Sequence, residues 1–311
     1  MSKFTGVSCS RPFHGKLSFF FFVSALIFTI FTIHVYQACA GPLRAINNSA
    51  KLPSVYGKVI YQTGRSGKGD LYIIGIGHRD TFTRSNGKNT AEIQAEVYEI
   101  GKWLIENKGV ELLLPEGFFS SGKNGGTNNI AAGNGPQPVT GDMESVEREL
   151  GGTIFINAEE LLTKNFNVII QQVEDYGLYK DVMTGIIMLE KSSGDPFGYI
   201  YKKMDLEYLQ ERRTAAILQR VPGIVESQIS DGNITDRRAI LTIGASHLPQ
   251  IIAGLRLNKL IIHSPAFSRF KDYTSDVNLL KKDFRVTVII PKAIAEDNSV
   301  THLIRLADYN K

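Results

Sequence analysis

The chain has 311 residues, of which 43% are hydrophobic and 21% are charged, so it has an ordinary globular composition and is long enough to bury a full core. Its formal charge of +4 comes mostly from the first 40 residues, which hold three basic residues and no acidic one. The remainder carries 32 basic against 31 acidic residues, and this balance excludes the strongly basic class of nucleic-acid-binding proteins.

Residues 1–40 predict a signal peptide or an N-terminal membrane anchor. An uncharged apolar run over 17–36 follows the basic residues, and Ala38-Cys-Ala40 has the small-x-small pattern of a cleavage site. The run is also nearly long enough to span a bilayer. In both cases we expect an extracytoplasmic protein, periplasmic or secreted, that meets the membrane only through this leader. The only cysteines, Cys9 and Cys39, lie in the leader, so any metal site beyond it needs His, Asp and Glu ligands.

Residues 41–311 predict a single α/β domain. A continuous apolar run over 71–76 indicates a strand that is covered on both faces. A helix is expected from the capping box Asn89-Thr-Ala-Glu92 to Lys108-Gly109, and another buried strand follows over 110–114. This strand–helix–strand unit predicts a parallel pair with a right-handed crossover.

A glycine-rich stretch interrupts the pattern over residues 117–141, where seven glycines lie among Ser, Asn and Lys. We expect a long flexible loop at the carboxyl end of the second strand. It is either a plain insertion or a lid over a site.

Strands and helices alternate along the rest of the chain. The predicted helices cover 156–165, 180–191, 206–221 with a stop at Pro222-Gly223, a segment after His247, and a segment that ends at 280–284. The other predicted strands are an edge strand at 55–61 and strands at 167–172, 239–244 and 286–290. This alternation predicts an α/β fold with a largely parallel central sheet flanked by helices.

Two of the buried strands run directly into the same motif. Gly75-Ile-Gly-His78 ends one strand and Gly244-Ala-Ser-His247 ends the other, 169 residues later. Ligands of parallel sheets bind beyond the carboxyl ends of the strands, and glycine lets the chain turn sharply there beside an imidazole. The repetition favours one centre that uses both histidines over two structural histidines. His263 and His302 lack this context and are expected to be ordinary.

Acidic residues mark other candidate positions. Glu116 follows the strand at 110–114, and Glu174 with Asp175 follows the strand at 167–172. Glu159 lies near the start of a helix, where a carboxylate is favourable in any case. Each of these acids is a site residue or a turn or helix cap.

An arginine lies in an apolar helix face. At about 100° per residue, Arg213 falls near the middle of a stripe and Arg212 at its edge, the stripe being formed by Leu206, Leu209, Ala216, Ile217 and Val221. A buried guanidinium needs an anionic partner. It would clamp Glu159 or Glu116, or it would stabilise an oxyanion.

In this order the residues resemble the superfamily that joins TraB/PrgY, the TIKI metalloproteases, the haem-binding lipoprotein ChaN and erythromycin esterase. The resemblance covers about residues 70–291 and rests on the two Gly-x-x-His motifs, Glu116, Ala158-Glu159, Val173-Glu174-Asp175 and Glu211-Arg-Arg-Thr-Ala-Ala216. The last segment lacks the family's usual Asn or Asp and Met-Ala, which leaves the choice between Arg212 and Arg213 open. The glycine-rich stretch has no family counterpart.

The TIKI branch implies an exported metal-dependent hydrolase that acts on a peptide or small-molecule substrate. His78 and His247 would hold a divalent Mn, Co, Fe or Zn ion, with Glu116 as third ligand or general base. Arg213 or Arg212 would neutralise the oxyanion, and Glu159 is a further catalytic candidate. The esterase branch implies the same residues without a metal, with histidine as the base.

The resemblance also allows a binding protein without hydrolytic activity. It would carry haem or another small ligand, as ChaN does, with Tyr176 or Tyr179 as an axial ligand, or it would bind a peptide pheromone, as TraB/PrgY does. The expected ligand-binding positions are Gly75, Gly244, Glu174 and Asp175. A third interpretation is an envelope interaction protein whose site has decayed.

Overall fold

The computed structural model describes residues 50–64, 67–77, 90–117, 157–192, 194–263, 273–276 and 283–297. The chain divides into two compact units, 1–45 and 46–311, and every described residue belongs to the second. The leader, residues 118–141 of the glycine-rich stretch, His78 and His302 therefore lie outside the described residues. Within those ranges, no helix combines the length and hydropathy that crossing a bilayer requires.

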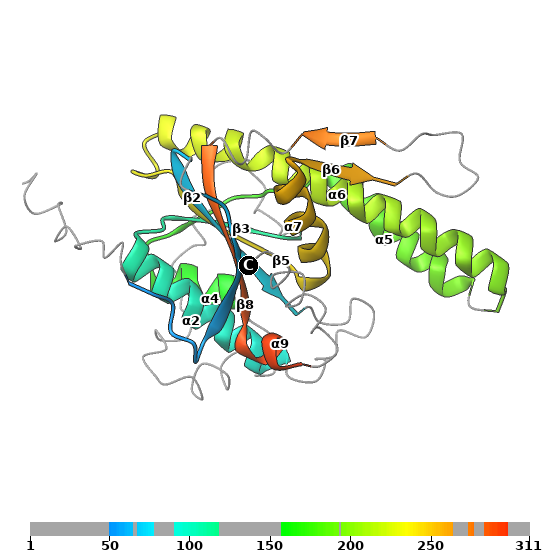
Figure 1. The fold of residues 1–311 in the computed structure, drawn as a ribbon, viewed down its shortest axis with the longest axis horizontal. Helices are drawn as coiled ribbons and strands as arrows, with labels where there is room; N and C mark the ends of the chain where they lie inside the picture. Colours follow the sequence, from blue (N-terminus) through cyan, green and yellow to red (C-terminus); the bar gives the residue numbers. More distant parts are fainter. Residues whose placement is uncertain are drawn as a thin grey trace, which may run out of the picture. The chain divides into compact units, whose positions relative to one another are not determined.

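The core of the described part is a six-stranded mixed sheet in the order β1-β8-β2-β5-β3-β4 (Figure 1). Only the β1–β8 pair is antiparallel among these neighbours. The strands are β1 (Gly57–Gln62), β2 (Gly69–Ile76), β3 (Leu112–Pro115), β4 (Ile169–Ile170), β5 (Arg238–Gly244) and β8 (Phe284–Pro291). The predicted α/β class with a mostly parallel sheet flanked by helices is confirmed, with an antiparallel edge strand close to the predicted 55–61.

The sheet register places the two motif strands side by side. β2 and β5 are parallel neighbours in which Ile76 is the partner of Gly244. β3 lies on the other side of β5, and the N–H of Glu116, just past its end, donates to the carbonyl of Thr242 at 2.9 Å. With β4 next to β3, the four strands that were expected to lead into polar residues are consecutive neighbours.

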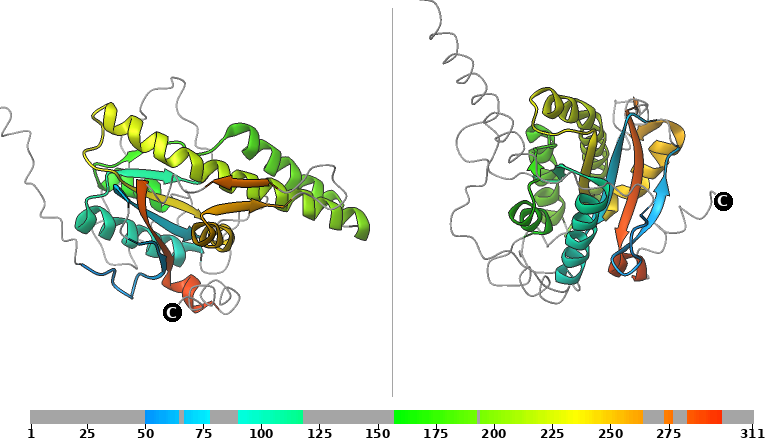
Figure 2. Two further views of the ribbon diagram at one scale, coloured as in Figure 1. Left: turned by 45° about the horizontal axis from the view of Figure 1, so that its top comes forward. Right: turned by 90° about the vertical axis from the view of Figure 1, so that its left-hand side faces the viewer.

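Helices cover both faces of the sheet (Figures 1 and 2). α2 (Thr90–Lys108) and α4 (Ala158–Asn165) share one core with Tyr72 and Ile74. α6 (Pro196–Ser230) and α7 (Leu248–Leu257) share the other core with Leu71 and Ile73. Alternate side chains of one strand therefore enter different cores, which explains why its sequence is apolar throughout.

α2 ends where the sequence predicted. The helix ends at Lys108, and Gly109 has a φ of +65°. This left-handed conformation suits glycine and ends the helix, as predicted. The proposed capping residue Asn89 lies outside the described residues.

Several predicted elements differ from the structure. α6 does not stop at Pro222 but runs to Ser230, because Val221 and Val225 on the same helix are buried in the core and their packing outweighs one lost backbone hydrogen bond. The strand expected over 167–172 is only the two residues of β4. Phe284 begins β8 instead of ending a helix.

Five further described elements were not predicted or have different bounds. β6 (Lys259–Ile262) and β7 (Tyr273–Asp276) form a separate antiparallel pair. A 3-10 turn, η1 (Ala245–His247), carries the second motif, and a short α9 (Lys292–Glu296) follows β8. α5 (Tyr176–Lys191) starts four residues earlier than expected, because Asp175 caps it.

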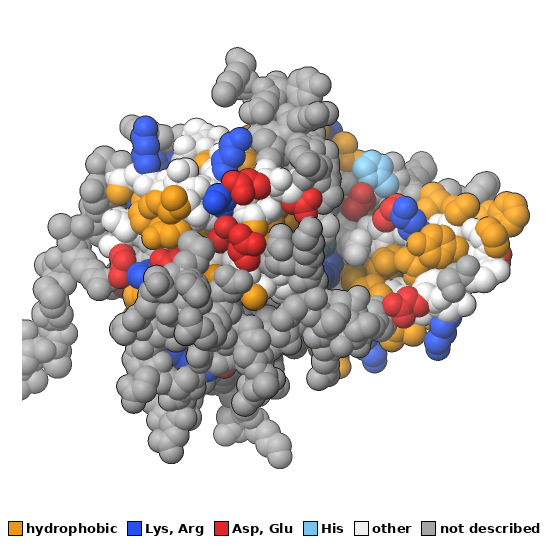
Figure 3. Space-filling view, turned by 90° about the horizontal axis from the view of Figure 1, so that it is seen from below, with side chains coloured by type: hydrophobic (Ala, Val, Ile, Leu, Met, Phe, Trp, Pro, Cys, Tyr) orange, Lys and Arg blue, Asp and Glu red, His pale blue; other side chains and the backbone are white. Residues whose placement is uncertain are grey.

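α5 and α6 form a helical hairpin that extends past the edge of the sheet (Figures 1 and 2). Gly185 allows close packing, since a Cβ at this position would lie 3.2 Å from Cδ1 of Leu206. The outer part of the hairpin exposes apolar side chains (Figure 3), among them Ile187, Met188, Phe197, Tyr199, Ile200 and Tyr201. The opposite end of α5 approaches the carboxyl edge of the sheet, where it lines a cavity.

Glu96 on α2 is buried against the start of α9. Its carboxylate accepts the N–H of Ala293 at 2.8 Å, and only 2% of the residue is exposed. Burial raises the pKa of Glu96 to about 7, and the hydrogen bond from Ala293 offsets only part of this effect. Compared with the unfolded chain, the folded protein therefore favours the protonated form of the Glu96 carboxyl.

We expect the stability contributed by protonated Glu96 to be fully present below the usual Glu pKa of about 4.5 and to be lost as the pH rises through about 7. Glu96→Gln keeps an oxygen for Ala293 and carries no charge. It should raise the free energy of unfolding by roughly 1–2 kcal/mol at pH 8 and change it little at pH 4. Urea unfolding at both pH values measures the effect, with Glu106→Gln on the same helix as control. Equal changes for Glu96→Gln at the two pH values would contradict the expectation.

Candidate functional site

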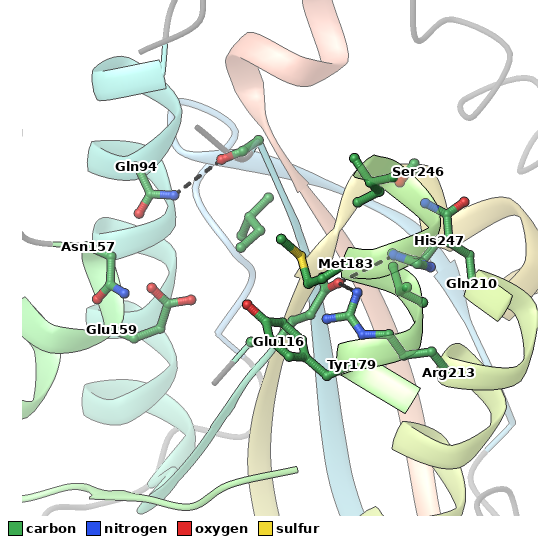
Figure 4. A pocket seen from close by; sticks show the side chains of 15 residues that line it. Gln94, Glu116, Asn157, Glu159, Tyr179, Met183, Gln210, Arg213, Ser246 and His247 are labelled. Atoms are coloured by element: carbon green, nitrogen blue, oxygen red, sulfur yellow. Dashed lines mark hydrogen bonds and ion pairs between the residues drawn. The ribbon is translucent and has the colours of Figure 1, made fainter. Parts of the chain in front are cut away.

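A cavity of about 400 Å³ opens at the carboxyl edge of the sheet (Figure 4). Its walls include the ends of β2 and β3, η1, and parts of α2, α4, α5 and α6. The polar side chains in the wall include Gln94, Glu116, Glu159, Gln210, Arg213 and His247. This volume suits a small ligand or part of a larger one. The cavity lies where the parallel strands were expected to form a site.

Arg213 connects two strand ends. Its Nε donates to Oε2 of Glu174 at 3.1 Å, its Nη2 pairs with Oε1 of Glu174, and its Nη1 lies 2.8 Å from Oε1 of Glu116. All three side chains are nearly or fully buried. The predicted buried arginine is thus Arg213, and its partners are Glu116 and Glu174 instead of Glu159.

The two carboxylates hold the guanidinium in its charged form. Burial by itself lowers the pKa of Arg213, but the hydrogen bonds and negative charges of Glu174 and Glu116 more than offset it and raise the pKa above its ordinary value. A bidentate contact with Glu174 also fixes the plane of the guanidinium. Nη1 is thereby aimed at Glu116, so Arg213 positions that carboxylate.

Glu116 is held through both of its oxygens. The backbone N–H of Gly244 donates to Oε2, while Oε1 faces Arg213 and lies 3.4 Å from Nε2 of His247. Donors on both oxygens suit an ionised carboxylate. Glu116 therefore links the end of β3 to the second Gly-x-x-His motif.

The tautomer of His247 follows from its other neighbour. The hydroxyl of Thr214 lies 2.8 Å from Nδ1 of His247 and donates to the carbonyl of Gln210 at 2.8 Å. A hydroxyl has one hydrogen, and a carbonyl can only accept. With this hydrogen on the Gln210 carbonyl, Nδ1 donates to Thr214, and in the neutral ring the lone pair of Nε2 then faces Glu116.

We expect Thr214→Val to let His247 exchange between its two neutral tautomers. The variant removes the acceptor for Nδ1–H in a fully buried place, which should cost about 1–2 kcal/mol of stability. Long-range ¹H–¹⁵N NMR spectra should show the protonated and bare nitrogens of His247 moving toward averaged shifts. Thr214→Ser keeps the hydroxyl and should keep the wild-type spectrum. An unchanged spectrum in Thr214→Val would contradict this assignment.

The distance between Nε2 of His247 and Oε1 of Glu116 is informative. At 3.4 Å it is longer than a well-formed hydrogen bond. Two ligands each about 2.1 Å from a tetrahedral metal ion are roughly 3.4 Å apart. A lone pair and a carboxylate oxygen at this separation thus fit two ligands of one divalent cation.

The described residues supply only part of a metal site. Within them, no group of three or more His, Cys, Asp or Glu side chains is placed to hold an ion. His247 and Glu116 give two donors, and a third has to come from elsewhere. His78 follows Gly77, which lines the cavity, but His78 itself is outside the described residues.

Glu159 belongs to a second polar group in the cavity wall. It is 3% exposed, and the hydroxyl of Thr242 on β5 donates to its Oε1. Nearby, Gln94 accepts the N–H of Ala158 at 2.9 Å and so ties α2 to the start of α4. In Figure 4, Glu159 and His247 appear on opposite sides of the cavity.

Other sequence-predicted site residues have structural roles. Asp175 is exposed and caps α5 by accepting the N–H of Leu178 at 3.0 Å. Gly75 makes room for Leu248, whose Cδ1 would lie 2.5 Å from an added Cβ. Gly244 has a φ of −51°, which any residue can adopt. Arg212 lies over the ring of Tyr208.

Of the remaining tyrosine and histidine candidates, one lines the cavity and two are exposed. Tyr176 is 63% exposed, whereas Tyr179 lines the cavity with its ring 5.5 Å from Cζ of Arg213. His263 is an exposed residue that pairs with Glu211 at 3.0 Å. His263 is thus a surface residue outside the described cavity wall.

Sequence reasoning missed Thr214, Thr242 and Gln94. Thr242 interrupts the apolar run of β5, and a polar residue in a buried strand requires a partner. That signal was present in the sequence. Thr214 and Gln94 lie on helices where polar residues are common, so nothing local distinguished them. Comparison of the chain with family models, curated proteins and solved structures found no match.

Proposed function

We propose that this protein is an exported metal-dependent hydrolase that cleaves a peptide bond or a related amide or ester. The observation that carries the proposal is the pair formed by Nε2 of His247 and Oε1 of Glu116, 3.4 Å apart at the wall of a cavity. The tautomer in which Nδ1 donates to Thr214 would direct a lone pair of the ring toward this carboxylate. We propose His78 as a further ligand, because it follows Gly77 at the end of the neighbouring strand.

A divalent Mn, Co, Fe or Zn ion bound here would polarise the substrate carbonyl and make water more acidic. Glu159 would take a proton from the attacking water and deliver it to the leaving group. This role suits a buried carboxylate in the cavity wall whose Oε1 is held by Thr242. Each substrate bond is then cleaved by addition of one water molecule.

Arg213 and Glu174 would hold Glu116 in position without contacting the substrate. Three N–H groups of Arg213 contact the two carboxylates. We therefore propose Arg213 as a positioning residue for Glu116 instead of the oxyanion stabiliser suggested by the sequence. Glu174, whose side chain is fully buried, holds Arg213 in that position.

Metal analysis tests the proposal directly. The full chain, purified without a His tag, should hold about one transition ion and should hydrolyse members of a peptide and ester panel. His247→Ala should lower the metal content at least tenfold, because one of the ligands is lost. His263→Ala is the matched control, since this exposed histidine lies outside the cavity wall, and it should keep wild-type metal content.

Full metal occupancy in His247→Ala would overturn the metal site. Hydrolysis without metal would instead favour the esterase-like mechanism with histidine as base. A Soret band on addition of haem, without hydrolysis, would favour a binding protein, for which the cavity-lining Tyr179 is the better axial candidate than the exposed Tyr176.

A further inference from the structure

We infer that α5 forms an apolar subsite beside Glu116, and that the substrate presents an aliphatic group next to the bond that is cleaved. This group would be an acyl chain or an aliphatic side chain. The inference rests on the proposed hydrolase function and assigns a substrate class to the same cavity.

One face of α5 supplies the apolar wall. Tyr179, Val182, Met183 and Ile186 all line the cavity. Their spacings of three, one and three residues place them on one side of a helix. Val182 is buried, while the other three are partly exposed. These three side chains therefore offer apolar surface to a ligand inside the cavity.

This wall lies next to the proposed reacting groups. The ring of Tyr179 is 5.5 Å from Cζ of Arg213, and Arg213 in turn contacts Glu116. Figure 4 shows Met183 between Glu159 and His247 in projection. A substrate whose carbonyl reaches Glu116 and His247 would thus place an adjoining group against α5.

Close helix packing holds the wall in place. At Gly185 an added Cβ would lie 3.2 Å from Cδ1 of Leu206 and 3.5 Å from Cδ1 of Leu209. Both leucines belong to α6, the helix that carries Arg213. The apolar wall and the charged group are therefore mounted on one pair of packed helices.

The charges of the cavity also select against acidic groups. Glu116 and Glu159 line it, Glu174 lies behind Arg213, and Arg213 is the one cation among the described lining residues. No charged residue of α5 lines the cavity among those described. An aliphatic group is thus favoured over an acidic one.

A chain-length series tests the subsite. For the full chain, kcat/KM toward p-nitrophenyl esters should rise from acetate through butyrate to hexanoate, by about fourfold for each methylene that the wall covers. Met183→Trp should remove most of this gain by filling the subsite. Met188→Trp is the matched control, because Met188 lies on the same helix but is 48% exposed and outside the cavity wall.

Met183→Ala serves as a second variant in case the Trp side chain prevents folding, which circular dichroism would reveal. It should reduce the gain per methylene without abolishing hydrolysis of the acetate. A flat chain-length profile in the wild-type protein, or equal profiles for the Met183 and Met188 variants, would overturn the subsite while leaving the hydrolase proposal intact.

A binding measurement separates the two proposals. Saturation-transfer NMR should detect hexan-1-ol, which cannot be hydrolysed, on the wild-type chain and on Met188→Trp, but not on Met183→Trp. If hexan-1-ol binds in this pattern and no member of the peptide and ester panel is cleaved, the subsite is supported and the hydrolase proposal fails. If esters are cleaved and hexan-1-ol does not bind in this pattern, the subsite fails.

Discussion

Glu116→Gln is expected to lower kcat/KM by at least about 100-fold and to release the metal ion that we propose for this site. The substitution keeps the size of the side chain but removes the charge that faces His247 and Arg213. Loss of groups that merely support metal ligands already costs 10–100-fold, so loss of a proposed ligand should cost at least as much. In addition, the new amide group has to direct its NH₂ toward one of two existing donors, the N–H of Gly244 or the guanidinium of Arg213.

The chain offers a matched control at the other end of the same strand. Glu111 precedes β3, and its Oε2 accepts from the N–H and hydroxyl of Thr235 at 2.6 and 2.9 Å. Glu111→Gln should leave kcat/KM and metal content within about twofold of wild type. Steady-state kinetics and metal analysis are measured on the same samples. Wild-type metal content in Glu116→Gln would show that this carboxylate is not a ligand.

Arg213→Met is expected to lower the free energy of unfolding by about 3–5 kcal/mol. The variant keeps an apolar stem but leaves the buried carboxylates of Glu116 and Glu174 without their cation. Removing one partner of a buried ion pair costs this much because the remaining charge stays buried and unpaired. Urea or guanidinium unfolding at pH 7 measures the change.

The adjacent residue provides the control for this prediction. Arg212 lies over the ring of Tyr208 and is partly exposed, so Arg212→Met should change stability by about 0.5–1 kcal/mol at most. The double variant Arg213→Met with Glu174→Met should recover part of the loss, because it replaces a buried charged pair with apolar groups. Equal effects of the two single arginine variants would contradict the assignment of Arg213 as the buried partner.

The sequence predicted which residues of a helix are buried better than it predicted where the helix ends or which distant residues it contacts. The position of Arg213 in an apolar stripe predicted its burial correctly, since helical periodicity alone determines which residues share a face. Its partner Glu174 is 39 residues away, and no local pattern encodes that contact. Pro222 illustrates the opposite case: a reliable local stop signal is overridden because residues on both sides of it are buried in the core.

In the candidate site, too, local features were predicted better than long-range contacts. Four strand ends were predicted to carry its residues, and the structure places those four strands next to one another. Which polar residues line the cavity or hold its lining residues was predicted less well. Asp175 is a helix cap, while Thr242 and Gln94 were not recognised, because only the packing of α4 against β5 and α2 gives their side chains a role.

The sequence by itself determined the apolar strands, their motif-bearing ends and the buried arginine, because these follow from short-range periodicity and from the cost of burying a charge. Only the tertiary structure decided that β5 lies between β2 and β3, and therefore that Gly244 and His247 meet Glu116. Strand order depends on pairing between segments more than 100 residues apart. That pairing is selected by the packing of both sheet faces at once, which no local stretch of sequence specifies.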